Sequence, residues 1–360
     1  MLQYTVYTNL FRIDEATLKN IEVRARNGEP EALFALGRYH YCTNSDPDSL
    51  TIAKECFGKA QASGLLEADV ALATMYRRGM IGAIDRKKAN RLLQHASDNG
   101  CKYAIEVMLT DKIYGWNGAE MDVAGATQQL EELLAQEEYP MWYYLMGCAK
   151  QQAQEMDAAG KWYERAIEKG IIDACSDLAY VKSHNEDGEM INEQAYITYL
   201  KRGAEMQDGV CVTLLALCRI ERYEEAGTYE RLLLSKELIV NLERAVALGC
   251  NTAAYYLGQV YLNGMYGIDT NYDRAWKWFI RGTALLSEDC YESAYDMLTE
   301  GYKPADNLDS DSCALNGARC GSTRLAIEVA KAYMQGKLAE HAQEIEEYFI
   351  PIYNTNNNKI

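Results

Sequence analysis

The chain has 360 residues, with 53 acidic side chains against 36 basic ones and a formal net charge of −17 at pH 7. This charge argues against nucleic acid and anionic membrane surfaces as partners, because both would be repelled. It favours a basic protein partner, although an acidic surface also serves solubility alone.

No stretch has the pattern of a secretory signal or of a membrane span. The first 18 residues lack a basic region followed by a long apolar core. The longest apolar run, around 212–218, is far too short to cross a bilayer. We therefore expect a cytoplasmic protein.

The first part of the chain is predicted to form helix pairs, each with a helix A, a turn and a helix B. Residues 1–12 are expected to be an irregular lead-in, and Asp14 the N-cap of a capping helix that ends near Asn27. Apolar residues at helical spacing then predict pairs within 31–60 and 67–100. Matches weaken from 103, where a longer loop separates 104–115 from 126–135.

The second half continues the pattern with one irregular unit. Pairs are predicted within 142–170 and 172–209, whereas 210–249 is the least regular, with a partly helical connection at 221–237. The clearest unit, 249–284, is followed by a helix A at 285–302 and an acidic loop at 302–312. A last helix A at 322–336 and a capping helix at 340–349 precede a tail, 354–360, that we expect to be disordered.

Glycines before helix A mark the repeat period, which is 36 to 40 residues where neighbouring units both carry one. They are Gly28, Gly64, Gly100, Gly170, Gly209, Gly249 and Gly321. Such a period predicts an all-α fold, an α/α solenoid wound as a right-handed superhelix, with about eight helix-turn-helix repeats and terminal capping helices. Because a solenoid grows in one dimension, residues 1–360 are expected to form one elongated domain. Its parts are the lead-in and cap helix (1–30), the repeats (31–336), and the cap helix with its polar tail (337–360).

The units resemble Sel1-like repeats (SLR), which are relatives of tetratricopeptide repeats with a longer unit. The pattern Ala-x3-Leu-Gly-x2-Tyr-x2-Gly, followed by a turn and Lys-Ala-x2-Trp, is matched in 249–284 by Ala253, Leu257, Gly258, Tyr261, Gly264, Gly267, Ala275 and Trp278. In 67–100 it is matched by Ala68, Leu72, Tyr76, Gly79, Gly82, Asp85, Lys88, Ala89, Ala96 and Gly100. The resemblance implies a scaffold that presents helix A on its concave side.

The 11 cysteines are at least seven residues apart, and no Cys-x-x-Cys occurs, which excludes zinc-knuckle and thioredoxin-like motifs. Some bacterial SLR proteins carry a disulfide in each repeat. Here the cysteines do not recur at a fixed position of the unit, so we expect free, buried thiols.

Motifs of common catalytic sites are missing from the sequence. It contains no Ser-x-x-Lys, no Gly-x-Ser-x-Gly, no His-Glu-x-x-His and no phosphate-binding glycine loop. The four histidines have no second ligand at metal-binding spacing. We therefore predict a protein that is not an enzyme, with no catalytic residues, no metal and no cofactor.

The helix A positions that do not pack between repeats are predicted to line a concave partner-binding surface. Tyrosine, which suits such surfaces, is abundant at 27 residues against 5 phenylalanines. The predicted partner-binding residues are Phe34, Arg38, Tyr103, Glu106, Tyr144, Thr252, Tyr255, Tyr256 and Gln259.

The leading hypothesis is a non-catalytic scaffold or adaptor that binds a protein or peptide, with a basic partner favoured, and acts as a monomer or weak dimer. An immunity or inhibitor protein that neutralises a basic partner is an alternative, implied by bacterial SLR proteins encoded beside toxins. A third alternative, a β-lactam or peptidoglycan hydrolase, is implied only by the resemblance to cysteine-rich SLR proteins, and the missing Ser-x-x-Lys argues against it.

Overall fold

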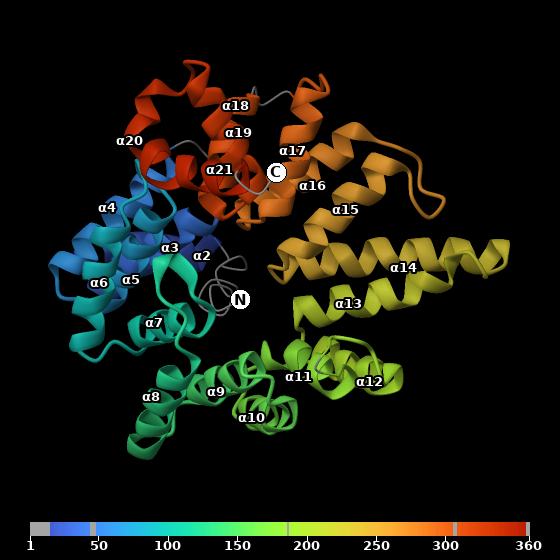
Figure 1. The fold of residues 1–360 in the computed structure, drawn as a ribbon, viewed down its shortest axis with the longest axis horizontal. Coiled ribbons are helices and arrows are strands. Elements are labelled where there is room, and N and C mark those ends of the chain that lie inside the picture. Colours follow the sequence, from blue (N-terminus) through green and yellow to red (C-terminus); the bar gives the residue numbers. More distant parts are fainter. Residues whose placement is uncertain (1–14, 44–47, 186, 305–307, 358–360) are drawn as a thin grey trace.

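The computed structural model describes residues 15–43, 48–185, 187–304 and 308–357, which are mostly helical (Figure 1). After α2 (Glu15–Arg26), these residues form eight consecutive helix pairs. The pairs are α3 (Pro30–Thr43) with α4 (Ser49–Ala62), α5 (Leu66–Arg77) with α6 (Arg86–Asp98), α7 (Lys102–Tyr114) with α8 (Val123–Gln136), α9 (Pro140–Gln152) with α10 (Met156–Glu168), α11 (Ala174–Ser183) with α12 (Glu193–Glu205), α13 (Gly209–Ile220) with α14 (Thr228–Ala247), α15 (Asn251–Asn263) with α16 (Tyr272–Ala284), and α17 (Glu288–Thr299) with α18 (Ser310–Cys320). The predicted helical solenoid of about eight repeats is confirmed.

The C-terminal part consists of α19 (Thr323–Met334), α20 (Ala342–Glu344), a π-helical turn (Ile345–Phe349) and α21 (Ile350–Asn357). The expected lead-in and the Asp14 cap lie outside the described residues. No helix of the described segments combines the length and apolar character that crossing a bilayer requires.

Asp and Asn side chains start several of the B helices. Each accepts a hydrogen bond from the backbone N–H three residues further on, which satisfies a group that has no partner within the helix. These caps are Asp85, Asp122, Asn192, Asn271 and Asp309. The residue type at each cap therefore sets where helix B begins.

Glycines on three A helices let helix B approach closely. Gly258 faces Phe279, and a Cβ built on Gly258 would lie 2.2 Å from the ring. Gly37 faces Phe57 and Gly147 faces Tyr163 in the same way, at 2.7 and 2.5 Å. In the α5–α6 pair, Ala73 takes the position of the glycine and Leu93 takes the position of the ring. Both side chains are buried in one apolar cluster. A larger residue on helix A thus goes with a smaller one on helix B.

One turn departs from the predicted glycine pattern. Gly100 and Gly249 end their B helices in the left-handed region, with φ of 82° and 90°. Before α13, however, Gln207 has the positive φ of 66°, and Gly209 is already helical. Gly209 is constrained by space instead, because a Cβ there would lie 3.1 Å from the carbonyl oxygen of Ala245.

The C-terminal helices pack against the second repeat, so the solenoid is not open and elongated as expected. Ile84, in the turn between α5 and α6, is buried in one cluster with Leu315 and Phe349. The Arg86 guanidinium lies 4.7 Å from the centre of the Tyr348 ring. The period predicts contacts between neighbouring repeats but carries no information on this distant contact.

Two sequence expectations near the C-terminus are wrong. The loop predicted for 302–312 ends earlier, because α18 begins at Ser310 with Asp309 as its N-cap. The tail predicted to be disordered from 354 is helical as far as Asn357, since α21 packs on α19 and Ile352 contacts the adjoining apolar cluster. By contrast, the connection at 221–237 is partly helical as predicted, with α14 starting at Thr228.

Candidate functional site: an acidic cleft on the helix A face

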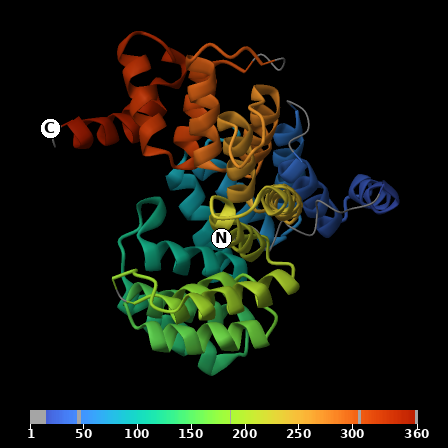
Figure 2. The ribbon, with the colours of Figure 1, turned by 90° about the vertical axis from the view of Figure 1, so that its right-hand side faces the viewer.

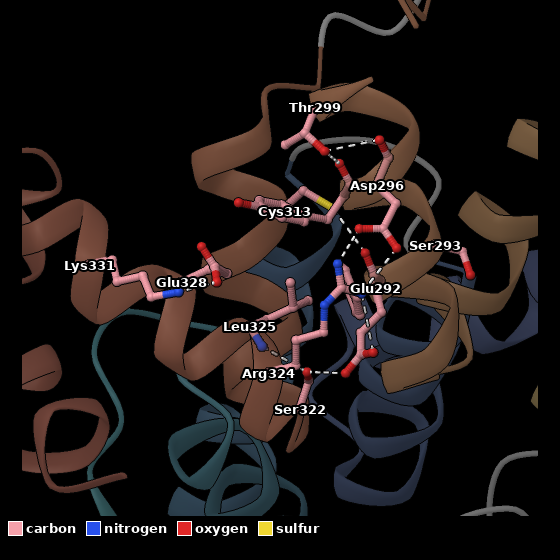
Figure 3. A network of polar contacts seen from close by, with 12 residues as sticks. Glu292, Ser293, Asp296, Thr299, Cys313, Ser322, Arg324, Leu325, Glu328 and Lys331 are labelled. Atoms are coloured by element: carbon pink, nitrogen blue, oxygen red, sulfur yellow. Dashed lines mark hydrogen bonds and ion pairs between the residues drawn. The ribbon is translucent and has the colours of Figure 1, made fainter. Parts of the chain in front are cut away.

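A cleft of about 740 Å³ opens between the N-terminal halves of α17 and α19, two neighbouring A helices. Figure 3 shows much of the polar network along it. The cleft is lined by Glu288, Asp289, Glu292, Gly321, Ser322, Thr323, Arg324, Ile327, Glu328 and Lys331. Four of these side chains are carboxylates and two are cationic, so the acidic cleft is negative when all are ionised.

The spacing along α17 places its carboxylates on one side of the helix. Glu288, Glu292 and Asp296 follow at intervals of four residues, which is close to one helical turn. Ser287 and Ser322 start α17 and α19 by accepting hydrogen bonds from the N–H groups of Cys290 and Leu325. The two caps fix the helix ends that border the cleft.

Arg324 connects the two helices across the cleft. Its guanidinium forms an ion pair with Asp296 and another, at 3.5 Å, with Glu292. The hydrogen bond to Asp296 raises the pKa of Arg324 above its ordinary value. The Ser322 hydroxyl also donates to Glu292, and Lys331 pairs with Glu328 at 2.8 Å. These contacts hold Glu292 and Glu328 in place.

The side chains of Glu288 and Asp289 form no hydrogen bond or ion pair within the described part of the chain, and both residues are exposed at the mouth of the cleft. Partial burial raises the pKa of Glu288, and the nearby charges of Asp289 and Glu292 raise it further. The pKa of Asp289 is raised by partial burial and by Glu292. A cation bound here would relieve this repulsion between carboxylates.

Four predicted partner-binding residues lie on α15, next to α17. The Gln259 amide donates to the Ser293 hydroxyl at 3.1 Å, which links the two helices. Burial raises the pKa of Tyr255, and Asp289 contributes, so this phenol lies near the acidic cleft. The rings of Tyr255 and Tyr256 meet edge to face at 5.6 Å, and Thr252 is exposed one turn before them. Tyr255 and Gln259 therefore approach α17, the helix that borders the acidic cleft, and Thr252 and Tyr256 lie on α15 next to Tyr255.

A second predicted group lies on α3 and α7. The Arg38 guanidinium is 5.7 Å from the centre of the half-buried Phe34 ring. The pKa of Tyr103 is raised mainly by burial and then by Glu106, and is lowered by Arg38. Phe34, Arg38 and Tyr103 are thus neighbours across the helix A face, and none of the three lines the acidic cleft. Phe34 shares an apolar cluster with Leu286, the residue before the Ser287 cap of α17.

Glu106 and Tyr144 are buried, contrary to the expectation that they line an open surface. The Tyr139 hydroxyl donates to Glu106 at 2.6 Å, and burial raises the pKa of Glu106 to about 7. The Tyr144 hydroxyl donates to Asp177 at 2.9 Å, and burial raises the pKa of Asp177 to about 6. Both residues therefore hold neighbouring A helices together in the described structure.

The acidic residues of α17 were missed because the sequence search followed the repeat motif. The sequence pattern that could have revealed them is the segment from Glu288 to Asp296, in which acidic residues recur at the spacing of a helical turn. The residues contributed by α19 could not be found in this way, because the pairing of Arg324 with two α17 carboxylates depends on how the two helices pack.

The cysteines recur more regularly than the sequence suggested. Cys101 and Cys250 are the N-cap residues of α7 and α15. Cys211 and Cys290 are each the third residue of an A helix and contact a glycine of the preceding B helix. The ten cysteines whose side chains are described are free, and burial raises the pKa of the Cys290 thiol to about 12. In these segments no three His, Cys, Asp or Glu side chains are grouped to hold a metal ion.

Comparison with known proteins identifies the repeat. The sequence profile described as Sel1 repeat matches residues 30–60, 66–101, 142–171 and 252–285, which correspond to the pairs α3–α4, α5–α6, α9–α10 and α15–α16. No curated protein matches the chain significantly.

Two solved structures resemble the chain at low sequence identity. One is a protective antigen of uropathogenic Escherichia coli strains that displays an SLR fold, at 20% identity and a TM-score of 0.39, with 94% of this chain and 72% of that chain covered. The other is a Sel1 repeat protein from Oxalobacter formigenes, at 17% identity and a TM-score of 0.43, with 89% and 92% covered. The chain therefore contains four Sel1 repeats.

Proposed function

We propose that the chain is a non-catalytic protein-interaction scaffold, and that the acidic cleft with the adjoining tyrosines of α15 binds a basic segment of a partner protein. Carboxylates that lack a cation attract Lys or Arg side chains, and the neighbouring Tyr255 offers apolar area and a ring face for a cation. The observation that carries the proposal is the continuity from Tyr255 and Gln259 on α15, through Ser293 and Asp289 on α17, to Arg324 on α19.

The proposal includes a single domain that spans residues 1–360. Consecutive helices from α2 to α19 contact one another, which supports a single unit. We also propose that the protein acts in the cytoplasm, as a monomer or weak dimer. A scaffold needs none of the catalytic motifs that the sequence lacks, and a basic partner accords with the net charge of −17.

Binding of a fluorescein-labelled peptide rich in Arg and Lys, measured by anisotropy on the full chain, tests the proposal. The double substitution Glu288→Gln with Asp289→Asn removes two charges and leaves the Arg324 contacts in place. We expect it to weaken binding about tenfold, and the affinity of the wild type to fall as salt is added.

The matched control is Glu131→Gln with Glu132→Gln, which removes two exposed charges from α8. An equal loss of affinity in both variants would mean that only the net charge matters and would contradict a site in the acidic cleft.

Tyr255→Ala should also weaken binding, because the ring would no longer cover the bound segment. Capture of a cellular partner by the wild type but not by Tyr255→Ala would then identify the natural ligand.

A further inference from the structure

Helix α14 differs from the other helices of the pairs in length and in its outer surface. It has 20 residues, whereas the other paired helices have 10 to 14. In Figure 1 it reaches the right-hand edge of the molecule, and in Figure 2 it is seen nearly end-on, pointing at the viewer. A long part of its outer face is therefore accessible.

Large apolar side chains lie in the open along this outer face. Tyr229, Leu232, Leu233 and Val240 are 75%, 53%, 43% and 63% exposed, and we call them the α14 stripe. Their positions fall on one side of a helix. The opposite side, with Ser235, Leu238 and Leu242, is buried against the solenoid. An exposed stripe of this kind on one helix is typical of a contact surface.

Charge distinguishes α14 from the rest of the chain. Its six charged residues are Glu230, Arg231, Lys236, Glu237, Glu243 and Arg244, three acidic and three basic. The helix is therefore neutral in a chain of net charge −17. A second copy of this acidic chain can approach here with the least repulsion, and a basic partner has no electrostatic preference for this helix.

The positions of the charges make the stripe complementary to itself. Glu230 and Lys236 lie three residues on either side of Leu233. Neither side chain has an ion pair or hydrogen bond within the segments that the structure describes. If two copies of α14 pair antiparallel with Leu233 facing its counterpart, each Glu230 faces the Lys236 of the other copy. Parallel pairing would place like charges opposite each other.

We propose that two copies of the chain associate through the α14 stripe, as an antiparallel helix pair with a twofold axis at Leu233. This interface is separate from the acidic cleft and does not depend on the proposed function. A helix of 20 residues is only about 30 Å long, so the contact is smaller than a standard protein interface. The dimer is therefore weak and forms at micromolar concentration or above.

Sedimentation velocity of the full chain across a concentration series tests the proposal. We expect the wild type to shift from monomer to dimer as concentration rises, and Leu233→Asp to stay monomeric. Met334→Asp adds the same charge at an exposed apolar residue of α19 and is the control that should dimerise like the wild type. Circular dichroism shows whether each variant keeps its helices.

Charge exchange tests the register. Glu230→Lys alone and Lys236→Glu alone should each weaken dimerisation about fivefold, because each puts like charges opposite one another twice. The double exchange should restore it. A wild type that stays monomeric throughout, or a dimer that Leu233→Asp leaves unchanged, would overturn the interface. Single exchanges without effect, or a double exchange that restores nothing, would overturn the antiparallel register.

Discussion

At the scale of single residues, Glu106 shows how burial changes the role of a predicted surface group. It is 4% exposed, and its hydrogen-bond partner is the Tyr139 hydroxyl. Burial raises its pKa from 4.5 to about 7. The folded protein therefore binds a proton that the unfolded chain has released between about pH 4.5 and 7. Stability contributed by this group is lost as pH rises through that range.

Glu106→Gln should therefore stabilise the protein in a pH-dependent way. Gln keeps an acceptor for Tyr139 but has no charge to desolvate, so we expect a gain of about 2 kcal/mol at pH 8 and much less at pH 5. Urea unfolding at the two pH values measures the difference. Glu131→Gln, on the exposed surface of α8, should show no such trend. A gain of the same size at both pH values would mean that Glu106 does not titrate as described.

The predicted site residues also show what a single sequence can reveal at this scale. Thr252, Tyr255, Tyr256 and Gln259 share one side of α15, because register within the helix fixes which side each residue faces, and Tyr255 and Gln259 approach α17. The same register predicted that Tyr144 would be exposed, but Tyr144 is buried. Its hydroxyl donates to Asp177 of the neighbouring α11. Helical periodicity gives direction, whereas exposure depends on the packing of the next repeat. The binding role of all nine residues stays a prediction.

At the scale of elements, the close approach of helix A and helix B depends on a glycine facing a ring. Adding a Cβ at Gly258 would press it against Phe279. We expect Gly258→Ala to lower the free energy of unfolding by about 1–3 kcal/mol, because the core has no space for the methyl group. Thermal or urea unfolding measures this loss.

The pair formed by Ala73 and Leu93 suggests the compensating change. Phe279→Leu alone should cost stability by leaving a void. Combined with Gly258→Ala, it should cost less than the two single losses added together, since the smaller side chain makes room for the methyl group. Strictly additive losses would show that the two side chains do not compete for the same space.

The pairs themselves were predictable from sequence, because the small and apolar positions repeat within each unit. The exceptions have physical causes. The start of α18 is set by the Asp309 cap, which lies among other acidic residues and was interpreted as loop. Helix α21 is rich in Asn, and its contacts with α19 outweigh the weak helical preference of that residue.

At the scale of the whole molecule, the contact between the C-terminal helices and the second repeat includes a buried ion pair. The Arg319 guanidinium donates two hydrogen bonds to Glu344, at 2.8 and 2.7 Å, and Glu344 is 1% exposed. Gly79 of the second repeat touches this pair, since a Cβ there would lie 2.7 Å from Arg319 Nε. Removal of Arg319 would leave the buried Glu344 charge without its guanidinium, and only His341, whose Nδ1 lies 3.9 Å from a Glu344 oxygen, would remain nearby.

Arg319→Ala should therefore open the contact. We expect a loss of about 3–5 kcal/mol in the free energy of unfolding and a larger radius of gyration in small-angle X-ray scattering. Lys102→Ala, which removes an exposed ion pair with Glu137, should cost less than about 1 kcal/mol and leave the radius unchanged. An unchanged radius for Arg319→Ala, with the helices intact, would show that apolar packing around Ile84 is sufficient to hold the ends together.

The contact of Ile84 and Arg86 with the C-terminal helices also bears on how the number of repeats can change. An open solenoid can gain or lose a unit, because each repeat touches only its neighbours. In this chain, one more unit between α6 and α17 would displace the C-terminal helices from the second repeat by about 10 Å, the distance between packed helices. Tyr348 would then no longer reach Arg86. Duplication of a repeat would therefore separate the two ends, so selection for the closed form would keep the copy number at its present value.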